Sequence, residues 1–184
     1  MKLLKPQAKK QKFRVIERAL IFQKGPIQLV DCRIQMASGK IISRQIFEHP
    51  GSVVIIPKIT RNKFIIIRQF RFASRDWLWE FPAGGLEKGE SVKCAAVREL
   101  MEEVGYRPKK LRKLLHFYPS PGVSSERMHL FLAEDLVPDK AVGDEDEEIQ
   151  SRIVSSKEIE KMIRGGEIVD AKTVAGYFFL KRFG

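Results

Sequence analysis

Residues 84–106, GGLEKGESVKCAAVRELMEEVGY, decide the fold of this chain and contain most of its recognisable chemistry. A glycine-rich turn leads into a segment whose apolar residues recur at four-residue spacing: Val92, Ala96, Leu100 and Val104. This spacing places the apolar side chains on one helical face, so we predict a helix over residues 91–104. Glu90 and Ser91 suit its beginning, and Gly105 suits its C-terminal exit.

Three carboxylates lie close together on this predicted helix. At about 100° per residue, Glu99, Glu102 and Glu103 fall within about one third of the helix circumference. Like charges at this spacing repel one another, and hard cations such as Mg²⁺ prefer carboxylate and carbonyl oxygens. Taken alone, the cluster has two interpretations: a cation site, or a solvated acidic stripe paired with nearby lysines.

The segment resembles the Nudix family box. That box has a glycine, five residues, a glutamate, seven residues, then Arg-Glu-apolar-any-Glu-Glu-any-Gly-apolar. The chain matches each specified position with Gly84, Glu90, Arg98-Glu99-Leu100, Glu102-Glu103 and Gly105-Tyr106, although Tyr106 is only marginally apolar.

The resemblance implies an α/β/α sandwich in which the box forms a loop, a helix and a loop. It implies metal binding by Glu99 and Glu103, with the carbonyl of Ala83 as a further metal ligand. Glu102 is expected as another ligand or as a catalytic base. The remaining box residues are given structural roles, and Gly84 is expected to permit close backbone approach: Gly84, Glu90, Arg98 and Gly105.

The chemistry implied is hydrolysis of a diphosphate bond, with Mg²⁺ as the expected cofactor and Mn²⁺ as an alternative. The ions neutralise diphosphate oxygens and support in-line attack by water, and a base must take the proton of that water.

Features outside the box resemble the ADP-ribose pyrophosphatase branch. Pro121 lies 16 residues beyond Gly105, within Ser120-Pro121-Gly122, and Glu126 follows shortly after. We assign these residues and Gly85 to substrate binding. Pro-Gly alone also predicts a turn before the next strand, and both interpretations are compatible.

The acidic segment 144–148 resembles the catalytic loop of the same branch. We assign Glu145 as the base and Glu147 as facing the metal, with a slip of two residues left open. The alternative is a solvated charged loop.

An N-terminal meander of strands is expected at residues 13–23, 27–35 and 41–48. In the branch resembled, such a region exchanges between subunits, so we expect a homodimer with an N-terminal β region at 1–50 and the hydrolase domain at 51–184. Arg44 and Arg71 match positions that hold the ligand, and a guanidinium pairs well with diphosphate oxygens.

The remaining pattern mixes strands and helices without regular alternation, which predicts an α+β class. Further strands are expected at 53–56, 64–67, 77–81, 111–118, 127–134 and 149–154, and helices at 156–164 and 170–181. Cys32 and Cys94 are interpreted as small buried residues.

Composition limits the other possibilities. Apolar residues make up 43% of the 184 residues, and no run is long enough for a membrane helix. The basic N-terminus precedes no apolar core of a signal peptide, so cytoplasmic location is the expectation. The net charge is +11, but no RNA-binding signature accompanies it, so we do not expect a nucleic-acid partner.

ADP-ribose, or a similar nucleoside diphosphate sugar, is the expected substrate. The box leaves open GDP-mannose, an 8-oxo-nucleoside triphosphate and an RNA 5′ end. A binding module without catalysis is a further alternative, which the intact box carboxylates disfavour.

Overall fold

The structure is a computed structural model that describes residues 13–139, 141 and 148–184. The chain packs into two compact units. Of the described residues, 13–49 and 120–125 form the first unit, and 50–119 with those from 126 onward form the second.

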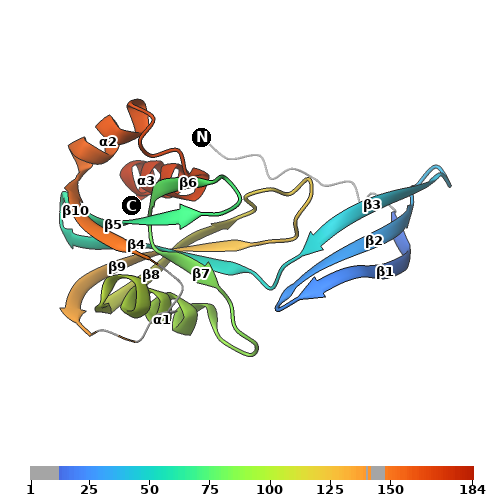
Figure 1. Ribbon diagram of the computed structural model, residues 1–184, viewed down its shortest axis with the longest axis horizontal. Helices are drawn as coiled ribbons and strands as arrows, with labels where there is room; N and C mark the ends of the chain where they lie inside the picture. The colour runs from blue at the N-terminus through green and yellow to red at the C-terminus, as the bar shows by residue number, and fades with distance from the viewer. Residues whose placement is uncertain (1–12, 140, 142–147) are drawn as a thin grey trace. The chain divides into compact units, whose positions relative to one another are not determined.

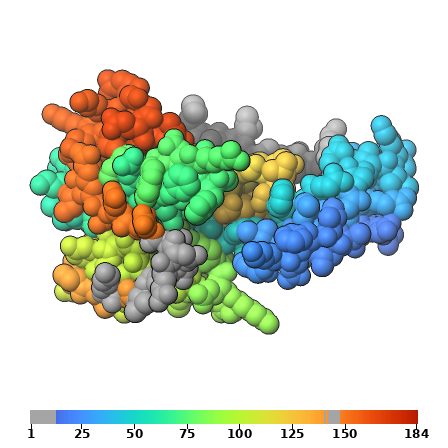
Figure 2. Space-filling model, in the orientation of Figure 1, coloured from blue at the N-terminus to red at the C-terminus, as the bar shows by residue number. Residues whose placement is uncertain are grey.

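The first unit is built on a three-stranded antiparallel sheet in the order β1-β2-β3, as the meander predicts. The strands are β1 (Arg14–Lys24), β2 (Ile27–Gln35) and β3 (Ile41–Glu48). Gly25, with a φ of 60°, allows the tight turn between β1 and β2. Every residue of β1 is exposed, and Figure 2 shows this strand (blue) open on the surface.

The second unit contains a seven-stranded sheet in the order β10-β5-β4-β9-β8, with β6 added to β5 and β7 added to β4. Its strands are β4 (Ser52–Thr60), β5 (Lys63–Arg71), β6 (Asp76–Glu80), β7 (Ala83–Gly85), β8 (Tyr106–Phe117), β9 (Met128–Pro138) and β10 (Gln150–Ser155). The β4–β9 pair is parallel and the other pairs are antiparallel.

Two apolar cores form on the two faces of this sheet because strand side chains alternate. Val53 and Ile55 of β4 pack toward α1 (Val92–Val104), while Val54 and Ile56 pack toward α2 (Ser156–Arg164) and α3 (Ala171–Phe183). Figure 1 shows α1 on one face and α2 and α3 on the other. The predicted α+β class and α/β/α sandwich are therefore confirmed.

Strands β4, β5 and β9 each run four residues past their expected ends, and two further strands, β8 and β7, differ in other ways. Strand β8 begins at Tyr106, directly after the helix, because its polar first half pairs with the end of β9. Strand β7 was not expected, since two of its three residues are glycines with low strand propensity. It forms because Ser52–Val54 pair with it.

The two cysteines differ in environment. Cys32 is buried, as expected, but Cys94 is exposed, so its prediction was wrong. Cys94 lies beside the apolar stripe rather than on it, and it lines an open hollow with Lys93 and Val97. Among the described residues, no helix is long and apolar enough to cross a membrane.

Candidate active site

Helix α1 is bounded by the residues that the sequence indicates. The side chain of Ser91 caps its first turn by accepting a hydrogen bond from the nitrogen of Cys94 at 3.2 Å. Gly105 ends the helix in the left-handed region, with a φ of 77°, and donates to the carbonyl of Met101. These caps set the rotation and length of the helix that carries the box carboxylates.

Arg98 is the organising cation of the box. Its Nε and Nη2 donate to the two oxygens of Glu90 at 3.1 and 3.0 Å, and Nη2 also donates to the carbonyl of Gly85 at 3.0 Å. Its Nη1 donates to Glu99 at 2.8 Å and to Glu102 at 3.0 Å. The hydrogen bond that Arg98 donates to Glu90 is the largest cause that raises the pKa of Arg98, and the same contact lowers the pKa of Glu90.

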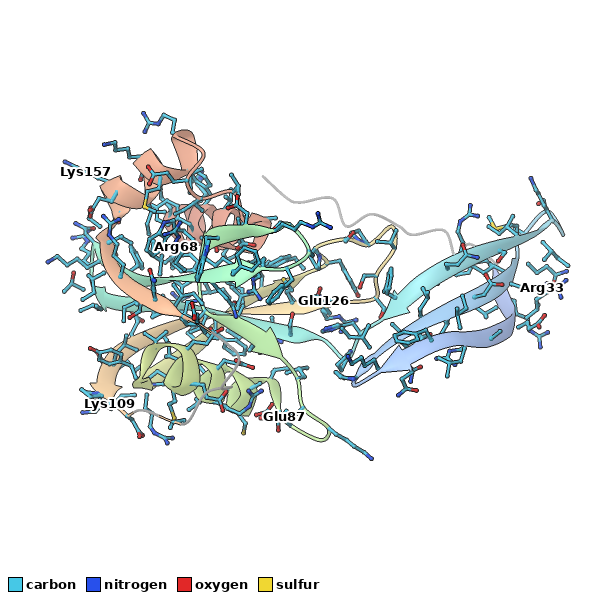
Figure 3. All side chains as sticks on the ribbon, viewed as in Figure 1. Arg33, Arg68, Glu87, Lys109, Glu126 and Lys157 are labelled. Atoms are coloured by element: carbon cyan, nitrogen blue, oxygen red, sulfur yellow. The ribbon has the colours of Figure 1, made fainter. Side chains whose placement is uncertain are left out.

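The box carries more negative charge than Arg98 compensates. Four carboxylates lie within ion-pair distance of this one guanidinium: Glu87, Glu90, Glu99 and Glu102. Glu87, labelled in Figure 3, is the most exposed of them and lies in the loop before α1. The surplus charge favours a bound cation.

Glu99 lies against the backbone of β7. A Cβ placed on Gly84 would overlap the Glu99 carboxylate, so glycine is required there for the helix to approach this closely. Glu99 is nearly buried, and its contact with Arg98 holds the carboxylate toward the strand.

Glu103 contacts β7 one residue earlier. Its Oε2 accepts a hydrogen bond from the nitrogen of Ala83 at 2.9 Å. The structure therefore brings together Ala83, Glu99 and Glu103, three of the four residues expected around a metal ion, with Gly84 allowing the close approach of Glu99.

The chemistry of these donors fits a hard divalent cation. Mg²⁺ typically takes one or two carboxylates from the protein and fills its remaining positions with water and phosphate oxygens. Glu99 and Glu103 supply such carboxylates, and Ala83 supplies a carbonyl oxygen. Within the described part of the chain, no group of three acidic, histidine or cysteine side chains converges on one point. The predicted ligand Glu147 and the predicted base Glu145 both lie outside the described residues.

Arg71, at the end of β5, lies beside this edge. Its Nε and Nη2 donate to the two oxygens of Glu80 at 2.8 and 2.7 Å. Arg71 also lines a cavity of about 690 Å³ with Gln69, Phe70, Phe72, Ala73, Trp77 and Glu148. A predicted ligand-binding arginine is thus fixed at the rim of a cavity large enough for a nucleotide sugar.

Glu126 reaches the same strands from two residues before β9. Its Oε1 accepts a hydrogen bond from the hydroxyl of Ser52 at 2.7 Å, and Ser52 pairs with Gly85 across β4 and β7. Figure 3 labels Glu126 in this region. The structure therefore places two predicted substrate-binding residues, Glu126 and Gly85, on either side of Ser52.

The other predicted substrate-binding residues belong to the first unit. Ser120, Pro121 and Gly122 form a turn in which the carbonyl of Ser120 accepts from the nitrogen of Ser124 at 2.9 Å. The turn is held on β3 because Phe47 donates to the carbonyl of Val123. Arg44 is exposed on β3 and donates to its neighbour's carbonyl, Ser43, at 2.8 Å.

Sequence reasoning missed the buried charges behind Arg71. Glu80 is fully buried and contacts Lys172, which in turn contacts Asp170 at the start of α3. The sequence carries one trace of this group: Asp170 precedes an apolar helical segment and suits a helix cap. A contact between residues 92 positions apart has no local signature.

Comparisons with known proteins agree with the box and the fold. The family model for the NUDIX domain matches residues 49–176. An ADP-ribose pyrophosphatase from Bacillus subtilis strain 168 is 38% identical over 170 residues, which covers 91% of this chain and 92% of that protein. A methanol dehydrogenase activator from Bacillus methanolicus is 34% identical with the same coverage.

A solved structure has the same fold. The crystal structure of an ADP compounds hydrolase superposes with a TM-score of 0.82 at 23% identity and covers 94% of both chains. The chain belongs to the Nudix family, as the box indicates. Nudix hydrolases generally need divalent metal ions.

Proposed function

We propose that this chain hydrolyses the diphosphate bond of ADP-ribose, or of a closely related nucleoside diphosphate sugar, to a nucleoside monophosphate and a sugar phosphate. The observation that carries the proposal is the similarity to an ADP-ribose pyrophosphatase over 91% of the chain. The complete box and the placement of Arg71 support it.

The residues of the box have separable tasks in this proposal. Glu99 and Glu103, with the carbonyl of Ala83, would hold Mg²⁺, which neutralises the diphosphate oxygens when bound. Arg98 keeps the carboxylates apart and oriented through its contacts with Glu90 and Glu99. Gly84 keeps the strand close to the helix.

Water attacks one phosphorus atom, and the bond from that phosphorus to the bridging oxygen breaks. A carboxylate takes the proton of the attacking water. We assign this base to Glu145, with Glu102 as the second candidate. Arg71 pairs with the diphosphate oxygens that do not take part in bond breaking. Its guanidinium lines the cavity and lies close enough to Glu103 to feel the charge of that carboxylate.

The test of this proposal is incubation of the purified protein with ADP-ribose and Mg²⁺, with products separated by chromatography. AMP and ribose 5-phosphate are expected in equal amounts, and removal of the metal with EDTA is expected to stop their formation. Intact ADP-ribose after long incubation with Mg²⁺ or Mn²⁺ would reject the proposal.

A homodimer is the second part of the proposal. The first unit has one sheet layer, and β1 exposes large apolar side chains: Val15, Leu20, Ile21 and Phe22. Exposed apolar surface of this extent is typical of an interaction site, and a second copy of the chain is the occupant that we propose.

Sedimentation velocity tests the dimer directly. The wild type is expected to sediment as a dimer at micromolar concentration, and Leu20→Asp is expected to shift it toward monomer and lower its activity. An active wild-type monomer at this concentration would contradict the dimer.

A further inference from the structure

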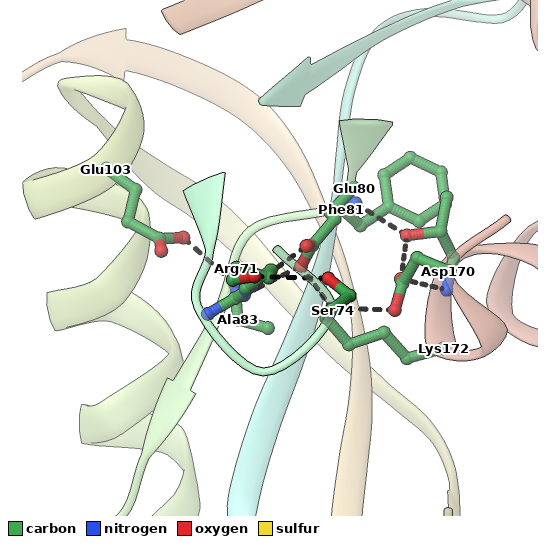
Figure 4. Close-up of polar contacts among 9 residues, drawn as sticks. Arg71, Ser74, Glu80, Phe81, Ala83, Glu103, Asp170 and Lys172 are labelled. Carbon is green, nitrogen blue, oxygen red and sulfur yellow. Dashed lines mark hydrogen bonds and ion pairs between the residues drawn. The ribbon is translucent and has the colours of Figure 1, made fainter. Parts of the chain in front are cut away.

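A buried cluster of four charged side chains lies behind the candidate active site. Glu80, at the end of β6, accepts from Arg71 through both oxygens and also accepts from Lys172. The Lys172 Nζ contacts Asp170 Oδ1 at 2.9 Å as well. Figure 4 shows Arg71 between Glu103 on one side and Glu80 with Lys172 on the other.

The start of α3 fixes this cluster in place. Asp170 caps the helix by accepting from the nitrogen and the hydroxyl of Thr173 at 2.9 and 2.6 Å. The Thr173 hydroxyl accepts from the nitrogen of Phe81 at 2.8 Å. Phe81 directly follows Glu80, and Thr173 directly follows Lys172. The Phe81–Thr173 hydrogen bond therefore holds the two backbones together beside the Glu80–Lys172 pair, so the ammonium group has little freedom.

The charges of the cluster balance only because of Lys172. Arg71 and Lys172 are cations, and Glu80 and Asp170 are anions, so the four sum to zero. Without Lys172 the cluster would carry one negative charge next to Arg71. Glu80 and Lys172 are both below one tenth exposed, so water screens this balance weakly.

Arg71 is the member of the cluster that a ligand reaches. Its side chain is 35% exposed and lines the cavity of about 690 Å³. Its pair with Glu80 uses Nε and Nη2, which form one edge of the guanidinium. The hydrogen bond to Glu80 is the largest cause that raises the pKa of Arg71, and the charge of Glu103 adds to it.

We propose that Lys172 is a positioning residue for the diphosphate: by sharing Glu80 with Arg71, it keeps the buried cluster neutral and leaves the outer edge of Arg71 available to phosphate oxygens. The proposal rests on the proposed function in one respect, since it assumes that the ligand in this cavity carries a diphosphate. Lys172 itself touches no ligand and acts only through Glu80 and Arg71.

The test compares Lys172→Met, Lys172→Arg and a control, Lys181→Met, which removes a more exposed lysine of the same helix that pairs with Glu160. The KM and kcat for ADP-ribose are measured for each, and binding of inorganic pyrophosphate with Mg²⁺ is measured by calorimetry. Lys172→Met is expected to raise KM and the pyrophosphate Kd by about tenfold with kcat nearly unchanged, because Arg71 holds ground state and transition state alike. Lys172→Arg is expected to restore most of the affinity, and Lys181→Met to resemble the wild type.

A double variant covers the case in which Lys172→Met fails to fold. Lys172→Met with Asp170→Asn removes one charge of each sign and keeps a good helix cap. In this background Arg71 and Glu80 balance each other, so the cluster is neutral again and pyrophosphate affinity is expected to recover toward that of the wild type.

Three results would overturn the proposal. The first is wild-type KM and pyrophosphate affinity in folded Lys172→Met, and the second is a loss of kcat and thermal stability in that variant without any change in affinity. The third is weak pyrophosphate binding in the folded, neutral double variant, which decides the question where Lys172→Met alone does not fold. Failure of the proposed function looks different. A wild type that binds pyrophosphate but leaves ADP-ribose intact would reject the substrate, while the pyrophosphate affinities of the variants would still decide the role of Lys172.

Discussion

The Glu103 carboxylate accepts a hydrogen bond from the nitrogen of Ala83 at 2.9 Å, which joins the last turn of α1 to β7. This contact fixes one proposed metal carboxylate beside the proposed carbonyl ligand. A substitution at position 103 that keeps the hydrogen bond but removes the charge therefore tests the role of Glu103 in catalysis apart from its role in stability.

Glu103→Gln makes that separation. The amide oxygen still accepts from Ala83, so a Tm within about 3 °C of the wild type is expected. Loss of the charge is expected to lower kcat by about 100-fold, measured as initial rates with ADP-ribose and Mg²⁺. Glu87→Gln is the matched control, since Glu87 is 70% exposed and its contact with Arg98, at 3.7 Å, is long. Full activity in Glu103→Gln would make the metal assignment wrong.

Gly84→Ala tests the close approach of β7 and α1. The added Cβ overlaps the Glu99 carboxylate, so the helix must shift or the carboxylate must leave its place. We expect a loss of about 2 kcal/mol in the free energy of unfolding, measured by urea denaturation. Gly85→Ala is the control for stability, because a Cβ there meets nothing within 4 Å. Equal stability of the two variants would contradict the packing described.

Arg98→Met tests the organising cation. The side chain of Arg98 is 24% exposed, and its loss leaves Glu90, Glu99 and Glu102 without the contact that compensates them. A loss of about 3 kcal/mol in the free energy of unfolding is expected in EDTA. Arg152→Met, which breaks a surface pair with Glu158, is expected to cost less than about 1 kcal/mol. Similar losses in the two variants would show that Arg98 is an ordinary surface cation.

Protonation of Glu80 is expected to lower the free energy of unfolding at acid pH. Burial acts to raise its pKa, but the contacts with Arg71 and Lys172 outweigh burial and lower it. A group with a lowered folded-state pKa contributes stability above its unfolded pKa, about 4.3 for glutamate, and loses it as pH falls through the folded value. The free energy of unfolding of the wild type is therefore expected to approach that of Glu80→Gln as the pH falls below about 5. A constant difference across this range in urea titrations would contradict the charge assignment.

Local sequence patterns predicted most of the fold because periodicity and caps act over a few residues. The stripe from Val92 to Val104 gave α1, and Ser91 and Gly105 gave its ends. The short strand β7 was missed because its glycines follow from the approach of Glu99, a contact across the fold. The early start of β8 was missed because its polar residues pair with β9 rather than with a core.

The residues of the candidate site also divide into those that local sequence patterns predict and those that depend on contacts across the fold. The box residues were predictable because their spacing is fixed by one helix and the loop before it. Lys172 was not, because its partner Glu80 is 92 residues away and a lysine on an apolar helix gives no sign of burial. The roles of Glu145 and Glu147 stay predictions, since both lie outside the described residues.

The measurement that tests the central claim most directly is kcat/KM for ADP-ribose against GDP-mannose, ADP-glucose, 8-oxo-dGTP and 5′-triphosphate RNA under one set of conditions with Mg²⁺. The account predicts the highest value for ADP-ribose, with AMP and ribose 5-phosphate as products. A higher value for a triphosphate or for RNA would keep the Nudix chemistry but contradict the assignment to nucleoside diphosphate sugars. Binding without turnover of any of these compounds would contradict the catalytic assignment itself.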